Sequence, residues 1–147
     1  MLRVSYEAVD DLPPGRFVQI DEGRGRVEIL LDRHAPLEDV IRQFNIEIHG
    51  MVRSVRWFQL WDDEIVSCNT PSTPLRIEFI LEMKEPWGAV FAERKGDLKA
   101  FVDPDIDVTR FAAVMNVLTA QHISGGRWFQ MYDGEIVDIS PEPMSQV

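Results

Sequence analysis

The sequence predicts an α+β protein formed by tandem duplication of one β-β-β-α-β-β unit, with mostly antiparallel sheet and one helix in each copy. Three observations support this prediction. An eleven-residue segment occurs twice, several segments alternate between apolar and polar residues, and one segment of each copy has helical spacing. We expect residues 1–70 and 71–147 to be the two copies, packed as one compact globule in a pseudo-twofold arrangement.

The repeated segment comprises residues 56–66, which recur as residues 127–137 with eight of the eleven positions identical. The same offset of 71 residues, carried upstream without a gap, pairs Asn45 with Asn116. A two-residue adjustment extends the match to the first strands, so the repeat covers nearly the whole chain. Residues 69–74 fall between the copies and have the Pro, Ser and Thr content of a connector.

Each copy is expected to begin with three strands. In the first copy, Val4 and Tyr6 alternate with polar neighbours, which is the period of a strand. Residues 16–21 and 26–32 are two further apolar runs on either side of a glycine-containing segment, residues 21–25. This arrangement predicts a hairpin with a glycine in the left-handed conformation.

A helix follows in each copy, because the apolar residues change to a spacing of three and four. The apolar stripes are Leu37, Val40, Ile41, Phe44 and Ile48 in the first copy, and Val108, Phe111, Ala112 and Met115 in the second. Pro36 marks the first helix start, and Asp105 with Asp107 marks the second, where acids satisfy free backbone N–H groups. Gly125 and Gly126 mark the second helix end.

The repeated segment closes each copy as a strand, a two-residue turn at residues 62–63 or 133–134, and a last strand. A unit of about 70 residues is marginally stable alone, so the two copies are expected to share a core.

Composition excludes several classes of function. The formal charge of -10 is spread along the chain, and arginines are interleaved with the acids, so no basic face is expected for DNA or RNA. No apolar run has the length of a membrane span, and the first residues lack the apolar core of a signal peptide. The single Cys68 cannot form an internal disulfide. We therefore expect a cytoplasmic protein that binds neither nucleic acid nor membrane.

The repeated strand is the most informative surface. Alternation places three of its residues on one face in each copy: Trp57, Gln59 and Trp61 in the first, and Trp128, Gln130 and Tyr132 in the second. With one helix per copy, a helix layer covers one face of the sheet and leaves the other for a second copy, another subunit or a ligand. The aromatic and glutamine face is the candidate partner surface. Ordinary core packing between the copies is the simpler interpretation, and a small-ligand site is the third.

No metal, cofactor or catalytic residue is assigned. Residues 103–107 have the acid spacing that opens a calcium loop, but Val108 holds the glycine position and Val114 the closing glutamate position. In the first copy only the first acid persists, as Asp32. Helix capping is therefore the preferred role of these acids.

The histidines also give no site, because His34, His49 and His122 differ between the copies and none has zinc-ligand spacing. Cys68 is expected to be a small buried residue. Asn45 and Asn116, which both copies keep, are expected to bind a nearby backbone group.

These observations favour a small acidic protein-protein interaction module, such as an adaptor, inhibitor, immunity protein or assembly subunit, and a homo-oligomer is compatible with them. The competing hypothesis is an enzyme or small-molecule binder with a cleft between the copies, where Gln59, Gln130 and Tyr132 would meet His49 or His122. A nucleic-acid mimic is disfavoured because the acids alternate with arginines.

Overall fold

The computed structural model describes residues 3–23, 25–54, 57–61, 64–67, 69–70, 73–74, 76–94, 97–124, 128–132 and 134–140. For residues 49–54, 57–61, 64–67, 69–70, 73–74, 76, 93–94, 97, 128, 130–132 and 136 this description covers the backbone alone. The fold is α+β, with two helices, two mixed three-stranded sheets, one four-stranded sheet and one two-stranded sheet in the described part of the chain.

The first half of the chain, residues 1–70, forms a three-stranded sheet. Its strands are β1 (Arg3–Val9), β2 (Val18–Gly23) and β3 (Arg26–Asp32), in the order β1-β3-β2. The predicted hairpin between β2 and β3 is confirmed, with Gly25 in the left-handed region at a φ of 66°. β1 joins β3 in parallel, so the sheet is mixed.

The second half, residues 71–147, forms a sheet of the same kind. Its strands are β8 (Arg76–Leu81), β9 (Ala89–Arg94) and β10 (Asp97–Val102), in the order β8-β10-β9. Again the outer strand, β8, is parallel to the central strand, and β9 is antiparallel to it. The two halves therefore have the same strand directions and the same strand order.

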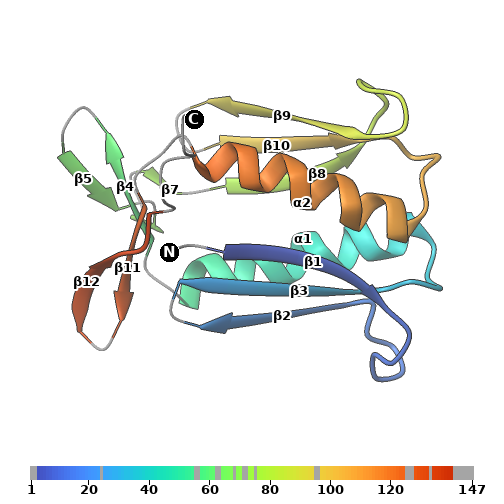
Figure 1. Cartoon of the computed structure of the whole chain (residues 1–147), viewed down its shortest axis with the longest axis horizontal. Helices are drawn as coiled ribbons and strands as arrows, with labels where there is room; N and C mark the ends of the chain where they lie inside the picture. Colours follow the sequence, from blue (N-terminus) through green and yellow to red (C-terminus); the bar gives the residue numbers. More distant parts are fainter. Residues whose placement is uncertain are drawn as a thin grey trace, which may run out of the picture.

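Two helices lie between these sheets, α1 (Leu37–Ser54) and α2 (Val108–Ser124), as Figure 1 shows. α1 contacts β2 of its own half and β8 of the other half, and α2 contacts β9 of its own half and β1 of the other. The apolar stripes predicted from the sequence are buried: Leu37, Val40, Ile41, Phe44 and Ile48 on α1, and Val108, Phe111, Ala112 and Met115 on α2. Neither described helix has the length and apolar character needed to cross a membrane.

The predicted helix starts are confirmed at Pro36 for α1 and at Asp107 for α2, whereas the Asp103 carboxylate binds the N–H groups of Trp87 and Asp105 ahead of the helix. The carbonyl oxygen of Pro36 accepts hydrogen bonds from the N–H groups of Asp39 and Val40, at 3.0 and 3.2 Å. At α2, the Asp107 carboxylate accepts a hydrogen bond from the N–H of Arg110 at 2.7 Å, as a helix cap does.

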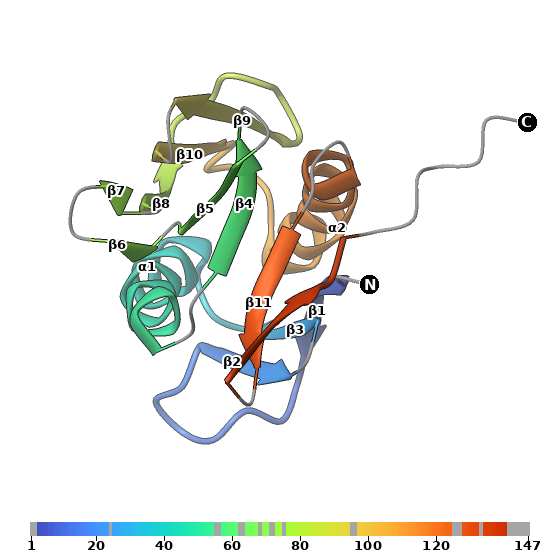
Figure 2. The ribbon, with the colours of Figure 1, turned by 90° about the vertical axis from the view of Figure 1, so that its left-hand side faces the viewer.

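A four-stranded sheet lies across one end of the molecule (Figure 2) and joins the halves. Its strands are β4 (Trp57–Trp61), β5 (Glu64–Ser67), β11 (Trp128–Tyr132) and β12 (Glu135–Asp138), in the order β12-β11-β4-β5. β4 and β11 pair antiparallel about Phe58 and Phe129, which lie opposite each other. The predicted connector contains a short ladder between β6 (Asn69–Thr70) and β7 (Thr73–Pro74).

The two halves share one core. An aromatic chain crosses it: the ring centroids of Tyr6 and Phe44 are 6.1 Å apart, those of Phe44 and Phe79 are 4.6 Å apart, and those of Phe79 and Phe111 are 5.9 Å apart. The close stack joins α1 of the first half to β8 of the second, so the core continues across the boundary between them.

One asparagine on each helix bonds that helix to the outer strand of the opposite half. Asn116 on α2 accepts a hydrogen bond from the N–H of Tyr6 at 2.7 Å and donates one to its carbonyl oxygen at 2.8 Å. Asn45 on α1 does the same for Phe79, at 2.8 and 3.0 Å. Each amide therefore pairs with a sheet edge as a neighbouring strand would. The prediction that these asparagines bind backbone is confirmed, and the backbone belongs to the other half.

Replacing Asn116 with Ala leaves the N–H and the carbonyl oxygen of Tyr6, which are partly buried, without their hydrogen-bond partner. We expect a loss of about 2–4 kcal/mol in the free energy of unfolding, measured by urea titration. Gln121→Ala, at an exposed position of the same helix, is the matched control and should change it by less than about 0.5 kcal/mol. Equal stability of the two variants would show that water replaces the amide.

Burial raises the pKa of Tyr6 to about 12, and the hydrogen bond from the Thr119 hydroxyl to the Tyr6 hydroxyl, at 3.2 Å, lowers it in part. Since the phenol loses its proton near pH 10 when unfolded and near pH 12 when folded, stability should fall as pH rises through this interval. The loss attributable to Tyr6 is about 3 kcal/mol. Urea titrations across this range should show a shallower decline for Tyr6→Phe than for Tyr132→Phe. An unchanged slope in Tyr6→Phe would contradict this assignment.

Candidate binding site

The residues predicted as a partner surface lie in β4 and β11. Trp57 is paired with Gln130 and Gln59 with Trp128, so the backbone brings these four together at the centre of the four-stranded sheet. Trp61 and Tyr132 pair instead with residues of their own hairpins, Glu64 and Glu135. The side chains of all six lie outside those that the structure describes, so the partner surface predicted there stays a prediction.

The histidines and the cysteine do not form a described site. His34 is exposed, His122 packs edge-on against Phe91 with ring centroids 5.6 Å apart, and the His49 side chain and Cys68 lie outside the described residues. Among the residues described, no three His, Cys, Asp or Glu side chains are placed to hold a metal ion.

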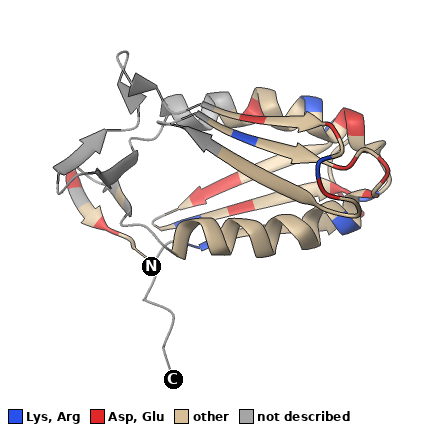
Figure 3. Ribbon diagram, turned by 90° about the horizontal axis from the view of Figure 1, so that it is seen from above, with Lys and Arg blue, Asp and Glu red and all other residues tan. Residues whose placement is uncertain are grey.

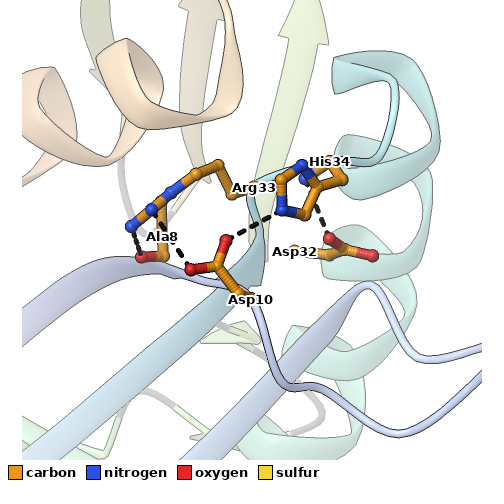
Figure 4. Close-up of polar contacts among 5 residues, drawn as sticks. All are labelled: Ala8, Asp10, Asp32, Arg33 and His34. Carbon is orange, nitrogen blue, oxygen red and sulfur yellow. Dashed lines mark hydrogen bonds and ion pairs between the residues drawn. The ribbon is translucent and has the colours of Figure 1, made fainter.

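The polar cluster at the end of β1 and β3 is built from surface contacts (Figure 4). The Asp10 carboxylate pairs with Arg33 at 3.3 Å and with His34 at 2.8 Å, and Arg33 also donates to the carbonyl oxygen of Ala8. Asp32 accepts a hydrogen bond from the N–H of His34. Because the ion-paired side chains are largely exposed, these contacts hold loop ends together at modest energy.

Several large apolar side chains are exposed, and one of them directs attention to the loop before β9. The large exposed apolar residues of the described chain are Ile46, Met83, Trp87, Val90 and Val117. Trp87 is 72% exposed, the largest exposed fraction among them, and it lies in the loop before β9. A tryptophan so placed in water contributes little to the core.

Trp87 occupies the third position of a tight turn. The carbonyl oxygen of Glu85 accepts a hydrogen bond from the N–H of Gly88 at 3.3 Å, Pro86 is the second residue, and Trp87 has a φ of 66°. This is the pattern of a type II turn, whose third residue is normally glycine. Holding a tryptophan in the left-handed region costs about 1–2 kcal/mol.

The first half builds its corresponding turn with the expected residue. There the carbonyl oxygen of Pro13 accepts from the N–H of Arg16 at 3.0 Å, Pro14 is second, and Gly15 is third with a φ of 80°. The second half therefore places a large aromatic side chain where the first half has none.

Two charged side chains hold the Trp87 backbone in this conformation. The Asp103 carboxylate, which is buried, accepts hydrogen bonds from the N–H groups of Trp87 and Asp105 at 2.8 and 2.9 Å. Arg110 donates from its Nε to the carbonyl oxygen of Trp87 at 3.0 Å. The peptide groups on both sides of the residue are thus fixed, so the indole is presented from a rigid support.

A groove of about 400 Å³ lies beside Trp87, between this turn and α2. Its walls are mainly apolar, and its lining includes Pro86, Trp87, Ala89, Val114, Val117 and Leu118. A second hollow touches Trp87 and Arg110 and is lined by Asp105, Ile106 and Asp107. Since Trp87 and Arg110 line both hollows, an apolar and an acidic depression are neighbours at these two residues.

The same region of the first half is filled by polar contacts. Gln43, which corresponds to Val114, accepts hydrogen bonds from the N–H groups of Phe17 and Val18 at 2.6 and 2.8 Å. Glu47, which corresponds to Leu118, forms an ion pair with Arg16 at 3.2 Å. The groove is therefore a feature in which the two halves differ.

No family model, no curated protein and no solved structure matches the chain, so the site is interpreted from its own geometry.

Sequence reasoning missed Trp87, Val117 and Arg110, because it searched for features that both copies keep. The signal was a difference between the copies: Pro14 is followed by glycine, whereas Pro86 is followed by tryptophan. An aromatic residue at a turn position that favours glycine marks a place where the sequence works against local stability.

The strain at Trp87 predicts an inverted order of stability for two small substitutions. Trp87→Gly should be more stable than Trp87→Ala by about 1 kcal/mol, because only glycine adopts a positive φ without steric cost. At an ordinary position alanine is the more stable of the two. Urea titration of both variants measures the difference, and an alanine variant as stable as the glycine variant would show that the turn relaxes.

Proposed function

We propose that this chain is a small acidic protein-interaction module and that its partner binds at the groove beside Trp87. One observation carries the proposal. Trp87 is exposed, is held in a sterically unfavourable backbone conformation, and lies next to an apolar groove. Buried tryptophans at the centre of an interface commonly supply a large share of binding energy. Trp87 lowers the stability of the free protein through its positive φ and is largely exposed. Burial of its side chain by a partner would explain why a tryptophan stands at this position.

The composition agrees with this role, since a net charge of -10 keeps a protein with an exposed apolar surface soluble. The proposal includes a cytoplasmic location and the origin of the chain by tandem duplication, with the halves related by a pseudo-twofold axis. The common strand order and the opposed Asn45 and Asn116 contacts support the duplication. In such a protein the common features build the scaffold, and the differing groove supplies the partner site.

Affinity capture with the tagged full-length chain from its native cells tests the proposal through a matched pair of variants. Val117→Ser changes the groove, and Ile46→Ser makes the same kind of change at the corresponding exposed position of α1. We expect the captured partner to be retained by Ile46→Ser and reduced about tenfold by Val117→Ser, as for a central interface residue.

Both variants should unfold at the urea concentration of the parent, since each residue is more than half exposed. Equal capture of the partner by the two variants would contradict binding at the groove. Failure of the parent chain to capture any protein in an amount comparable to its own would also contradict the proposal.

A further inference from the structure

We propose that the groove and the acidic hollow together bind an extended segment of the partner in which an apolar residue and a lysine or arginine lie two positions apart. This inference rests on the proposed function and adds the chemistry of the partner. Its three parts are the apolar groove, the acidic hollow and the backbone at the start of β9.

The apolar part is the groove beside Trp87. Val114, Val117 and Leu118 form the helix side, and Pro86 and Ala89 form the turn side. Val117 is 57% exposed, so it can bury more apolar surface when covered. A side chain of the size of leucine or methionine fits a groove of about 400 Å³ with room for the neighbouring peptide groups.

The acidic part is the second hollow, whose lining also includes Trp87. Asp105 and Asp107 line this hollow, and the one cation that lines it, Arg110, already donates its Nε–H to the carbonyl oxygen of Trp87. With Glu85 on the rim of the groove, the four charged side chains carry three negative charges and one positive charge. Figure 3 shows that acidic residues gather in the loops at this end of the molecule. A cation in the hollow would contact the carboxylates and the indole face together.

The backbone part is inferred from the first half, where the amide group of Gln43 occupies the corresponding place and accepts hydrogen bonds from the N–H groups of Phe17 and Val18. Valine at position 114 cannot accept a hydrogen bond. A peptide carbonyl of the partner would restore at Ala89 the contact that Gln43 provides at Val18.

The spacing follows from the shape of an extended chain. Alternate residues of a strand point to the same side and lie about 6.6 Å apart. The two hollows share Trp87 and Arg110 in their linings and are therefore neighbours, so we expect residues at positions i and i+2 of an extended segment to reach both. Charge complementarity thus favours a basic peptide segment over a nucleic acid or an acidic protein.

Selection from a phage-displayed library of random twelve-residue peptides tests this inference, using the full-length chain as the bait and the Trp87→Gly variant for counter-selection. We expect enriched peptides to contain an apolar residue two positions from Lys or Arg. A synthetic peptide of the enriched sequence should bind about fivefold or more weakly to Asp105→Lys than to the parent chain. Asp11→Lys makes the same charge change at an exposed loop position of the first half and should alter binding by less than about twofold.

Three results would separate the claims. Peptides that need Trp87 but carry no basic residue, or bind Asp105→Lys as tightly as the parent, would overturn the inferred partner chemistry and leave the groove as the site. Peptides that bind Trp87→Gly equally would overturn both the inference and the proposed site. If no peptide is selected but Val117→Ser still captures less of the native partner, the inference that the partner binds through a linear segment would be overturned, and the proposed site would stand.

Discussion

Two asparagine side chains hold the outer strand of each half against the helix of the other half, and the arrangement of the molecule depends on this contact. β1 and β8 are each an outer strand of a three-stranded sheet. Asn116 and Asn45 satisfy one N–H and one carbonyl group on each. Because the bonds are made between halves, each outer strand gains these two bonds only when the other half is in place. The stacked rings of Phe44 and Phe79 then continue the core through the same boundary.

A scaffold fastened in this way can carry a local cost elsewhere. Trp87 adopts a backbone conformation that is normally adopted by glycine, and Asp103 and Arg110 hold it there with two hydrogen bonds. The corresponding turn of the first half, with Gly15, has no such cost. The halves thus have the same strand order and the same asparagine contacts, which the fold requires, and they differ at the turn and groove beside Trp87. This division between scaffold and site is the physical basis of the proposed interaction function.

Much of the fold could be predicted because it depends on local patterns. The helical stripe around Phe44 and the hairpin at Gly25 follow from periodicity and turn chemistry, and both are confirmed. The parallel pairing of β1 with β3 could not be predicted, since the choice of a strand partner is a long-range matter. The asparagines could be recognised as backbone ligands, but their target in the other half depends on how the halves pack. The site was missed because a left-handed turn residue such as Trp87 leaves no mark in an apolar pattern.

Native-state hydrogen exchange of the Tyr6 and Phe79 amides tests most directly whether the two contacts join the halves into one cooperative unit. We expect both amides to exchange only through global unfolding, with protection free energies within about 0.5 kcal/mol of each other and of the value from urea titration. Exchange of either amide through a local opening well below the global free energy, or clearly different values for the two, would contradict the dependence of each half on the other.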